Sequence, residues 1–330
     1  MRHLATHAFA LFPPRWPWVL ATFVLALGAP HGTWACAPSN VGPFDANTYY
    51  AGLDGLTGEA LKAALNARID GHTAQPKSCL FTILAETDED PNNPDNVLAF
   101  YTQRSMAKSD RDFGGNTPDA WNREHIWAAS HGISNSGQHG HTDLHHLRAT
   151  DKSVNADRED HDFGDAPAPG GAADSECTAC REDASLGIWE PGDAQKGDVA
   201  RMMFYMDTRY DGDASEPTAT PDLMLVDRTT DAGSPAHGLV CVLLDWHLTD
   251  PVSDAERLRN DRVYAWQGNR NPFIDLPAAA VNVYGPTCGI PPPLPIPTRA
   301  VPLPPWSLAL AGLVIAMLFR GYTTYQKPVA

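Results

Sequence analysis

The sequence predicts an α+β domain in which a mixed, mostly helical scaffold surrounds a small core of strands. Apolar residues recur at helical spacing in two stretches, a third stretch has the pattern of a charged helix that ends near Gly268, and short apolar or alternating runs predict three strands. The helical stretches are 51–67, 196–210 and 254–266, and the strands are 80–84, 96–101 and 142–147. With 330 residues, 43% hydrophobic and 19% charged, the chain has the composition of a globular protein with a sizeable core.

The N-terminus has the pattern of an export signal. Two arginines precede the apolar run Trp18–Leu27, and Thr33-Trp34-Ala35 places small residues three and one before a cleavage point. We therefore expect residues 1–35 to be a signal peptide removed after Ala35, with an uncleaved signal anchor as the alternative. Export would place the protein in the periplasm, on the cell surface or in the extracellular medium.

Six cysteines in an exported chain predict disulfide bonds. Cys177 and Cys180 form a C-x-x-C motif, and because no second such motif is present we expect a disulfide within this loop rather than a zinc site. Cys36 would be the first mature residue, but Thr33-Trp34-Ala35 is a poor lipoprotein signal, which disfavours lipidation. The remaining pairing stays open.

The C-terminus combines a stiff segment with an apolar one. Residues 291–305 contain eight prolines and predict an extended linker. Residues 306–330 begin with 14 residues without a charge, which span ~21 Å as a helix against a hydrocarbon core of ~30 Å. The segment is either a membrane anchor, with Arg320 on the cytoplasmic side, or a sorting tail of the kind found in some exported bacterial proteins. The sequence does not separate the two.

The first half of the domain contains an acidic stretch between two expected elements. Residues 86–94 follow the expected strand at 80–84 and alternate acids with Pro and Asn. Alternating acids can bind calcium, but Pro and Asn favour a solvated turn. We expect the turn.

The central stretch Trp121–Gly164 carries most of the chemistry, with six histidines between His125 and His146. Glu124 is a ligand type suited to Mg²⁺ or Ca²⁺, and the adjacent His125 can deprotonate water as a neutral imidazole. Neighbours in an extended segment point to opposite sides unless a bend turns both toward one cleft. Phosphodiester cleavage needs a nucleophile and a cation, and this pair could supply both.

Downstream residues strengthen this hypothesis. Residues 142–147 alternate like a strand, and Thr150 can cap a helix that begins at Asp151. On that helix Asn155 and Arg158 are three residues apart and share a face. We expect the strand, turn and helix to direct both side chains toward Glu124 and His125.

Two other interpretations are weaker. Zinc would need soft ligands, but no H-E-x-x-H motif is present and the C-x-x-C lies in a separate loop. The net charge of −16 argues against a nucleic-acid coat protein, because such binding depends on clustered Lys and Arg. The same net charge does not argue against an enzyme that binds only a few phosphates through a metal ion and local arginines.

The motifs together resemble the secreted bacterial nucleases of the endonuclease I family, which have a ββα-metal (His-Me finger) active site. The matching segments occur in family order and cover most of residues 45–280. They are ETDEDPNNPDNV (Glu86–Val97), NREHIW (Asn122–Trp127), TDLHHLRATDKSVNADRED (Thr142–Asp160), WEPGDAQKGDVARMMFYM (Trp189–Met206) and GNRNPFID (Gly268–Asp275). The resemblance implies a catalytic domain over 36–290.

The resemblance also implies a role for each residue. His125 would be the general base, and Glu124 and Asn155 would bind the cation, Mg²⁺ with Ca²⁺ or Mn²⁺ as alternatives. Asp143 and His145 would orient the site, or His145 would lie near the substrate. An arginine should stabilise the phosphate, and both Arg148 and Arg158 are candidates. His131 and His139 have no family counterpart, and we expect both in solvated loops.

The sequence therefore predicts an exported, metal-dependent and sequence-nonspecific endonuclease that acts on DNA, RNA or both. Two alternatives come from other classes: a secreted, calcium-stabilised surface-binding module, and an inactive relative that still binds nucleic acid. The intact set of Glu124, His125 and Asn155 argues against the inactive form.

Overall fold

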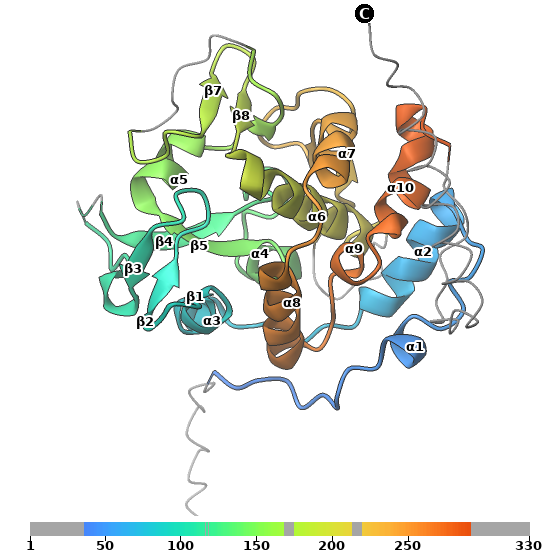
Figure 1. The fold of residues 1–330 in the computed structure, drawn as a ribbon, viewed down its shortest axis with the longest axis horizontal. Coiled ribbons are helices and arrows are strands. Elements are labelled where there is room, and N and C mark those ends of the chain that lie inside the picture. Colours follow the sequence, from blue (N-terminus) through green and yellow to red (C-terminus); the bar gives the residue numbers. More distant parts are fainter. Residues whose placement is uncertain (1–35, 116, 118, 168–174, 213–219, 292–330) are drawn as a thin grey trace, which may run out of the picture. The chain divides into compact units, whose positions relative to one another are not determined.

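The computed structural model describes residues 36–115, 117, 119–167, 175–212 and 220–291 (Figure 1). The expected signal peptide (1–35) and C-terminal segment (306–330) lie outside the described residues, as does the linker beyond residue 291. None of the helices in the described ranges is long and apolar enough to cross a membrane.

The fold is α+β, as the sequence predicts. The α-helices are α1 (Ala46–Tyr49), α2 (Gly58–Ile69), α3 (Leu80–Thr87), α4 (His139–Thr142), α5 (Lys152–Arg158), α6 (Asp193–Arg209), α7 (Val240–Thr249), α8 (Asp254–Gln267), α9 (Pro272–Asp275) and α10 (Ala278–Tyr284). The strands are β1 (Glu89–Asp90), β2 (Asn93–Leu98), β3 (Ser105–Ala107), β4 (Trp121–His125), β5 (Leu147–Asp151), β6 (Asp162–Phe163), β7 (Arg181–Asp183), β8 (Ile188–Glu190), β9 (Met224–Leu225) and β10 (Ala236–His237). They form small separate sheets ordered β1-β2-β3, β4-β5, β6-β8-β7 and β10-β9.

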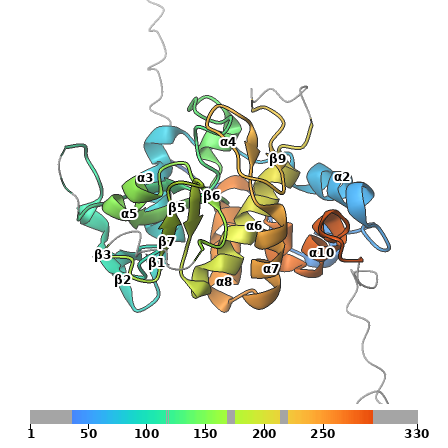
Figure 2. The same cartoon turned by 90° about the horizontal axis from the view of Figure 1, so that it is seen from above.

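Helix α6 is the centre of the helical part, and α2, α7 and α9 pack against it (Figures 1 and 2). Every residue from Val199 to Arg209 is buried, including the methionines at 202, 203 and 206. The methionine stripe therefore packs in the core, as we expect from its helical spacing.

A second, smaller core supports the strands. It joins α3, the β1-β2-β3 sheet, the β4-β5 hairpin and α8, and contains Leu80, Val97 and Trp121. In Figure 1 the β1-β2-β3, β4-β5 and β6-β8-β7 sheets and α5 lie on one side of α6, and α2 and α10 lie on the other.

The β4-β5 hairpin and α5 form a ββα unit. The strands are antiparallel, with Trp121 opposite Asp151 and His125 opposite Leu147. Helix α5 follows β5 without a loop and packs on both strands. Its N-cap is Asp151, whose carboxylate accepts from the Ser153 backbone N–H, and not Thr150 as the sequence suggests.

Two expected strands are wrong. Residues 80–84 belong to helix α3, because the apolar run continues into a helical pattern that a five-residue window does not resolve. Residues 142–147 are the end of α4 and a loop, and the strand starts only at Leu147. The alternation misled because the polar residues of this loop are buried along with the apolar ones.

The other boundaries are closer to expectation. Helix α2 starts at Gly58 instead of residue 51, after turns in which Gly52 and Gly55 have φ values of +85° and +76°. The strand expected at 96–101 is β2, shifted toward the N-terminus. Helix α8 matches its prediction, with a Ser253–Glu256 capping box and Gly268 at the C-cap.

Three disulfides connect the six cysteines. Cys177 bonds Cys180, which confirms the predicted loop disulfide, and the others are Cys36–Cys79 and Cys241–Cys288. The Cys36 sulfur is thus bonded to another cysteine, in agreement with an unlipidated residue. The acidic stretch at 86–94 is not a solvated turn throughout, because Asp88 is buried and bonded to Arg148 and Arg259.

Candidate active site

Glu124 is a buried carboxylate on the side of β4 that faces α5. Its Oε1 accepts a hydrogen bond from the Tyr101 hydroxyl at 2.7 Å and lies 3.6 Å from Arg158 Nη1. The side chain is 1% exposed. Burial raises the pKa of Glu124, and Arg158 and the Tyr101 hydroxyl oppose that rise only in part. Arg158 and Tyr101 therefore offset only part of the free-energy cost of burying the charged Glu124 carboxylate.

Asn155 and Arg158 both lie against β4 from α5. The Asn155 amide Nδ2 donates to Asn122 Oδ1 at 2.8 Å, and a second carbonyl, that of Arg123, lies 3.4 Å away. Because Nδ2 donates to two oxygens, the orientation of the amide is fixed. The Oδ1 atom of Asn155 therefore keeps its lone pairs for another partner. Since alternate residues of a strand share a side, Asn122 and Glu124 both face this helix.

His125 lies on the other side of β4. Its Nε2 is 3.0 Å from the backbone carbonyl of His141, and its ring lies 4.6 Å from the His141 ring and 5.5 Å from the His146 ring. A carbonyl oxygen only accepts hydrogen bonds, so Nε2 must carry the proton. In the neutral ring, Nδ1 is then the nitrogen with a lone pair that can accept a proton. Burial lowers the pKa of His125 well below its usual value, and His146 and His141 lower it further.

The structure does not bend Glu124 and His125 into one cleft. Glu124 contacts Tyr101 and Arg158, whereas His125 contacts two other histidines. The pair therefore flanks the end of β4 from two sides, as extended backbone dictates.

The oxygens of Glu124 and Asn155 fit a hard divalent cation. Within the described ranges, no three His, Cys, Asp or Glu side chains are grouped so as to hold a metal ion. A carboxylate and an amide oxygen are instead the sparse set suited to a cation that keeps several waters and takes phosphate as a further ligand. Such an ion would also compensate the buried charge of Glu124.

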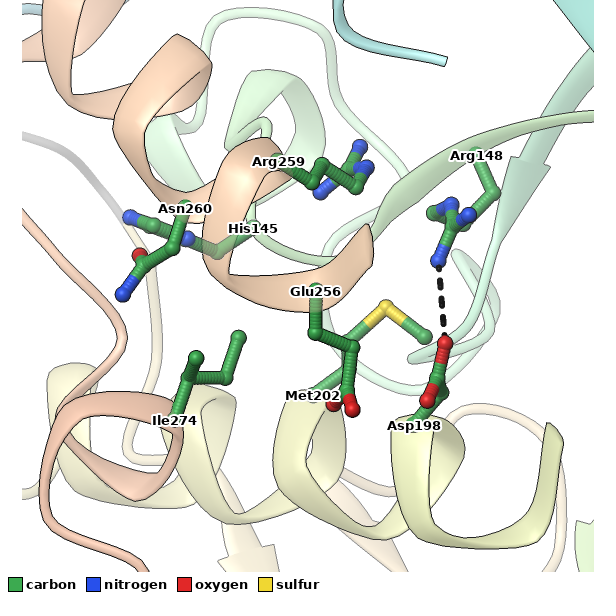
Figure 3. A pocket seen from close by; sticks show the side chains of 8 residues that line it. All are labelled: His145, Arg148, Asp198, Met202, Glu256, Arg259, Asn260 and Ile274. Atoms are coloured by element: carbon green, nitrogen blue, oxygen red, sulfur yellow. Dashed lines mark ion pairs between the residues drawn. The ribbon is translucent and has the colours of Figure 1, made fainter. Parts of the chain in front are cut away.

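The two candidate arginines have different surroundings. Arg158 donates to the backbone carbonyls of His125 at 3.1 Å and Ile126 at 3.0 Å, and is 1% exposed. It fixes the end of β4 beside Glu124. Arg148 lies opposite Glu124 in the β4-β5 pairing, and its guanidinium bonds Asp88 at 2.9 Å and lies 3.8 Å from Asp198, in the pocket shown in Figure 3.

Asp143 and His145 belong to a buried network. The Asp143 carboxylate accepts from the hydroxyls of Tyr205 (2.8 Å) and Tyr210 (2.9 Å) and from Gln267 Nε2 (2.8 Å). Burial raises its pKa, but nearby histidines outweigh burial and the net direction is downward. His145 Nε2 lies 3.1 Å from the Asn269 carbonyl and the residue is 2% exposed. Both residues are placed to orient the loop before β5.

The expectation for His131 is wrong. It is 1% exposed, its Nδ1 lies 2.7 Å from the Ala236 carbonyl, and its ring stacks on His237 at 4.5 Å. A single histidine in a Gly- and Ser-rich stretch gives no sign of a partner a hundred residues away. His139 is partly buried, 5.2 Å from the His72 ring.

Comparison with known proteins decides the family. Residues 57–278 match the family model described as endonuclease I, which covers more than half of the chain and every residue discussed above. The chain belongs to the endonuclease I family. It is accordingly a nuclease, and the surface-binding alternative is set aside.

Two relatives have similar sequences along most of the chain. An extracellular ribonuclease of Bacillus subtilis (strain 168) is 44% identical over 267 residues, 79% of this chain and 83% of the relative. An extracellular ribonuclease of Bacillus amyloliquefaciens is 44% identical over 246 residues, 73% of this chain and 79% of the relative. This endonuclease I family member thus resembles both relatives over about three quarters of its length.

Proposed function

We propose that the protein is an exported, divalent-metal-dependent and sequence-nonspecific endonuclease that hydrolyses phosphodiester bonds in RNA and in DNA. The observation that carries the proposal is the environment of His125, whose Nε2 is committed to the His141 carbonyl. The ring is thereby held in one tautomer with Nδ1 available as a proton acceptor.

His125 would act as the general base. Its lowered pKa keeps the imidazole neutral at and below neutral pH, so the base is ready before substrate binds. Nδ1 takes a proton from water, the water oxygen forms a bond to phosphorus, and the bond from phosphorus to one ester oxygen breaks. The leaving oxygen takes a proton from solvent water, and His125 then releases its own proton to solvent. Arg158 holds the strand end on which His125 lies through the carbonyls of residues 125 and 126.

Glu124 and Asn155 would hold the cation. When bound, a divalent cation such as Mg²⁺, Ca²⁺ or Mn²⁺ stabilises charge that develops on the phosphate oxygens. Tyr101 orients the Glu124 carboxylate through its hydroxyl, and Asn122 orients the Asn155 amide.

The names of the two relatives, both called extracellular ribonucleases, support RNA as the proposed substrate. DNA should be cut as well, because attack by water does not use the ribose 2′-hydroxyl. Export is supported by the signal-like N-terminus, the three disulfides and the relatives described as extracellular. The C-terminal segment would then serve as an anchor or a sorting tail.

Parallel cleavage assays test the proposal. Supercoiled plasmid and a long RNA are incubated with the mature protein in Mg²⁺, Mn²⁺ or Ca²⁺, and in EDTA. We expect both substrates to be cut at many positions with a cation and neither in EDTA. RNA products should lack a 2′,3′-cyclic phosphate, since the 2′-hydroxyl does not attack.

Each component can fail separately. Full cutting in EDTA would contradict metal dependence. Cyclic phosphate ends on the RNA products would contradict water as the nucleophile, and intact plasmid beside degraded RNA would restrict the substrate to RNA.

A further inference from the structure

Three cationic side chains beside β4 have no Asp or Glu within ion-pair distance; they are Arg111, Arg123 and Lys77. In the part of the chain that the structure describes, most Arg and Lys side chains do form such a pair, and Arg68 and Arg228 are further exceptions. The chain as a whole has a net charge of −16. Unpaired cations that collect in one place on such an acidic protein are unneutralised charge available to an anion.

These cations lie around two phenylalanine rings. The Arg123 guanidinium lies 4.6 Å from the centroid of the Phe81 ring, and that of Arg111 lies 5.5 Å from the same ring. Arg111 also lies 4.7 Å from the Phe113 ring, which is 76% exposed. A large exposed aromatic ring with a cation against one face leaves its other side to solvent.

The same cations lead toward His125. Arg123 precedes His125 by two residues in β4, so both side chains leave the strand on the same side. Arg123 Nη1 lies 3.4 Å from the Lys77 carbonyl, and both cations lower the pKa of His141, whose backbone carbonyl binds His125. The order along the surface is thus Phe113, Arg111, Phe81, Arg123, His125.

Nearby carboxylates restrict where phosphate can lie. Asp112 is bonded to Lys152 at 3.1 Å and to the Gly114 N–H at 2.9 Å. Its charge also acts on Arg123, opposing the fall that burial causes in the pKa of that guanidinium. Asp110 and Asp119 line an open groove of about 530 Å³ together with Arg111 and Phe113. The two carboxylates would repel phosphate from their part of the groove and could accept hydrogen bonds from the amino groups of a neutral base, which leaves the Arg111 side to phosphate.

We propose that Phe113, Arg111, Arg123 and Lys77 form a docking track for single-stranded nucleic acid. An unpaired base stacks on Phe113, and the following phosphates contact Arg111, Arg123 and Lys77 on the way to His125. Stacking requires an unpaired base because both faces of a paired base are covered in a duplex. The inference rests on the proposed function, since it supplies the substrate of the same site.

Fluorescence anisotropy in EDTA measures binding without cleavage. The ligands are a labelled single-stranded oligonucleotide and its duplex, titrated at several salt concentrations. We expect Phe113→Ala to weaken single-strand binding roughly tenfold, with the salt dependence and duplex binding nearly unchanged. Arg111→Gln and Arg123→Gln should each reduce the slope of log K against log salt by about 0.7, the value for one lost phosphate contact.

Matched variants lie elsewhere on the surface. Arg68 also lacks a carboxylate partner in the described ranges and bonds the Ala51 carbonyl, and Leu248 on α7 is 53% exposed. Arg68→Gln and Leu248→Ala should bind both ligands as the wild type does. A thermal melt of each variant confirms the fold.

Two results would overturn the track. One is single-strand affinity unchanged in Phe113→Ala, and the other is salt slopes in Arg111→Gln and Arg123→Gln equal to that of Arg68→Gln. The wild-type cleavage assay separates this failure from that of the proposed function. If the wild type cuts in Mg²⁺ but the track variants bind normally, only the track is wrong, whereas absence of cutting with any cation contradicts the proposed function whatever the binding data show.

Discussion

Glu124 and His125 are adjacent in sequence but occupy opposite sides of β4. One is a buried carboxylate whose pKa is raised, and the other is an imidazole whose pKa is lowered. Burial is the first cause of both shifts, and each shift favours the neutral form. A neutral imidazole at His125 can accept a proton. A bound cation would stabilise the charged form of the Glu124 carboxylate.

Replacement of Asn155 tests the cation site. Asn155→Ala removes the amide oxygen, and we expect the Mg²⁺ concentration for half-maximal cleavage to rise more than about tenfold. Asn96→Ala is the matched control, because that exposed amide bonds Ser105 in the β1-β2-β3 sheet. If both variants need the same Mg²⁺ concentration as the wild type, Asn155 is not a ligand.

The pH dependence of cleavage tests the state of His125. A histidine with a pKa well below 6.5 stays deprotonated as the pH falls through 6.5, so the base remains competent there. At saturating cation we expect a constant rate between about pH 7 and 6 and a decline only below, whereas an unperturbed histidine would lose half the rate near its usual pKa of ~6.5. A rate already halved at pH 6.5 would contradict this assignment.

At the scale of elements, α5 is the part that links the sequence motif to the site. It places Asn155 and Arg158 against β4, and its first turn is held by Asp151, which also pairs with Arg104. Loss of that cap should loosen the helix that carries two site residues.

Two cap variants separate stability from positioning. Asp151→Ala and Ser253→Ala each remove an N-cap side chain, from α5 and α8 respectively, and each should lower the free energy of unfolding by about 1–2 kcal/mol. Urea denaturation measures that loss. Only Asp151→Ala should also lower kcat, because α8 carries no proposed catalytic residue; equal kcat values in both variants would show that α5 does not need its cap to position the site.

The predictability of elements follows their length and regularity. Helices α6 and α8 are long, and periodicity or caps identify them closely. Residues 142–147 fail because tertiary contacts bury Asp143, His145 and His146 together, so alternation of polarity carries no information there. Arg123 and Lys77 escape notice because nothing in the sequence tells an unpaired surface cation from a paired one.

For the whole molecule, buried neutral histidines set the response to acid. The pKa values of five histidines fall to about 4, in each case chiefly through burial; they are His72, His145, His146, His237 and His247. The unfolded chain binds protons at these sites below about pH 6.5, and the folded chain does so only near pH 4. Stability is therefore complete above pH 6.5 and declines as the pH falls toward 4.

The common direction of these shifts predicts destabilisation by acid. Each of the five histidines binds its proton more readily in the unfolded chain, so each contributes to the loss of stability as the pH falls below about 6.5. Thermal melts followed by circular dichroism should show Tm falling steadily between pH 6.5 and 4. A Tm that is constant over this range would mean that these histidines are not neutral in the folded protein.

The sequence of the whole chain indicates a globular protein with an export signal. It does not indicate which distant cysteines form disulfides. Cysteine count predicts disulfides, and only the short Cys177–Cys180 loop could be paired from spacing. Cys36–Cys79 and Cys241–Cys288 join segments more than 40 residues apart, which depends on how the helices pack.

Chemical rescue of His125→Ala tests the central claim most directly. The variant should cleave labelled single-stranded RNA and DNA roughly 10²- to 10⁴-fold more slowly than the wild type in Mg²⁺. Added imidazole should restore part of that rate in proportion to its neutral form, and His161→Ala, a histidine paired with Glu182 outside the site, should keep the wild-type rate. Wild-type cleavage by His125→Ala without imidazole would contradict the assignment of His125 as the base.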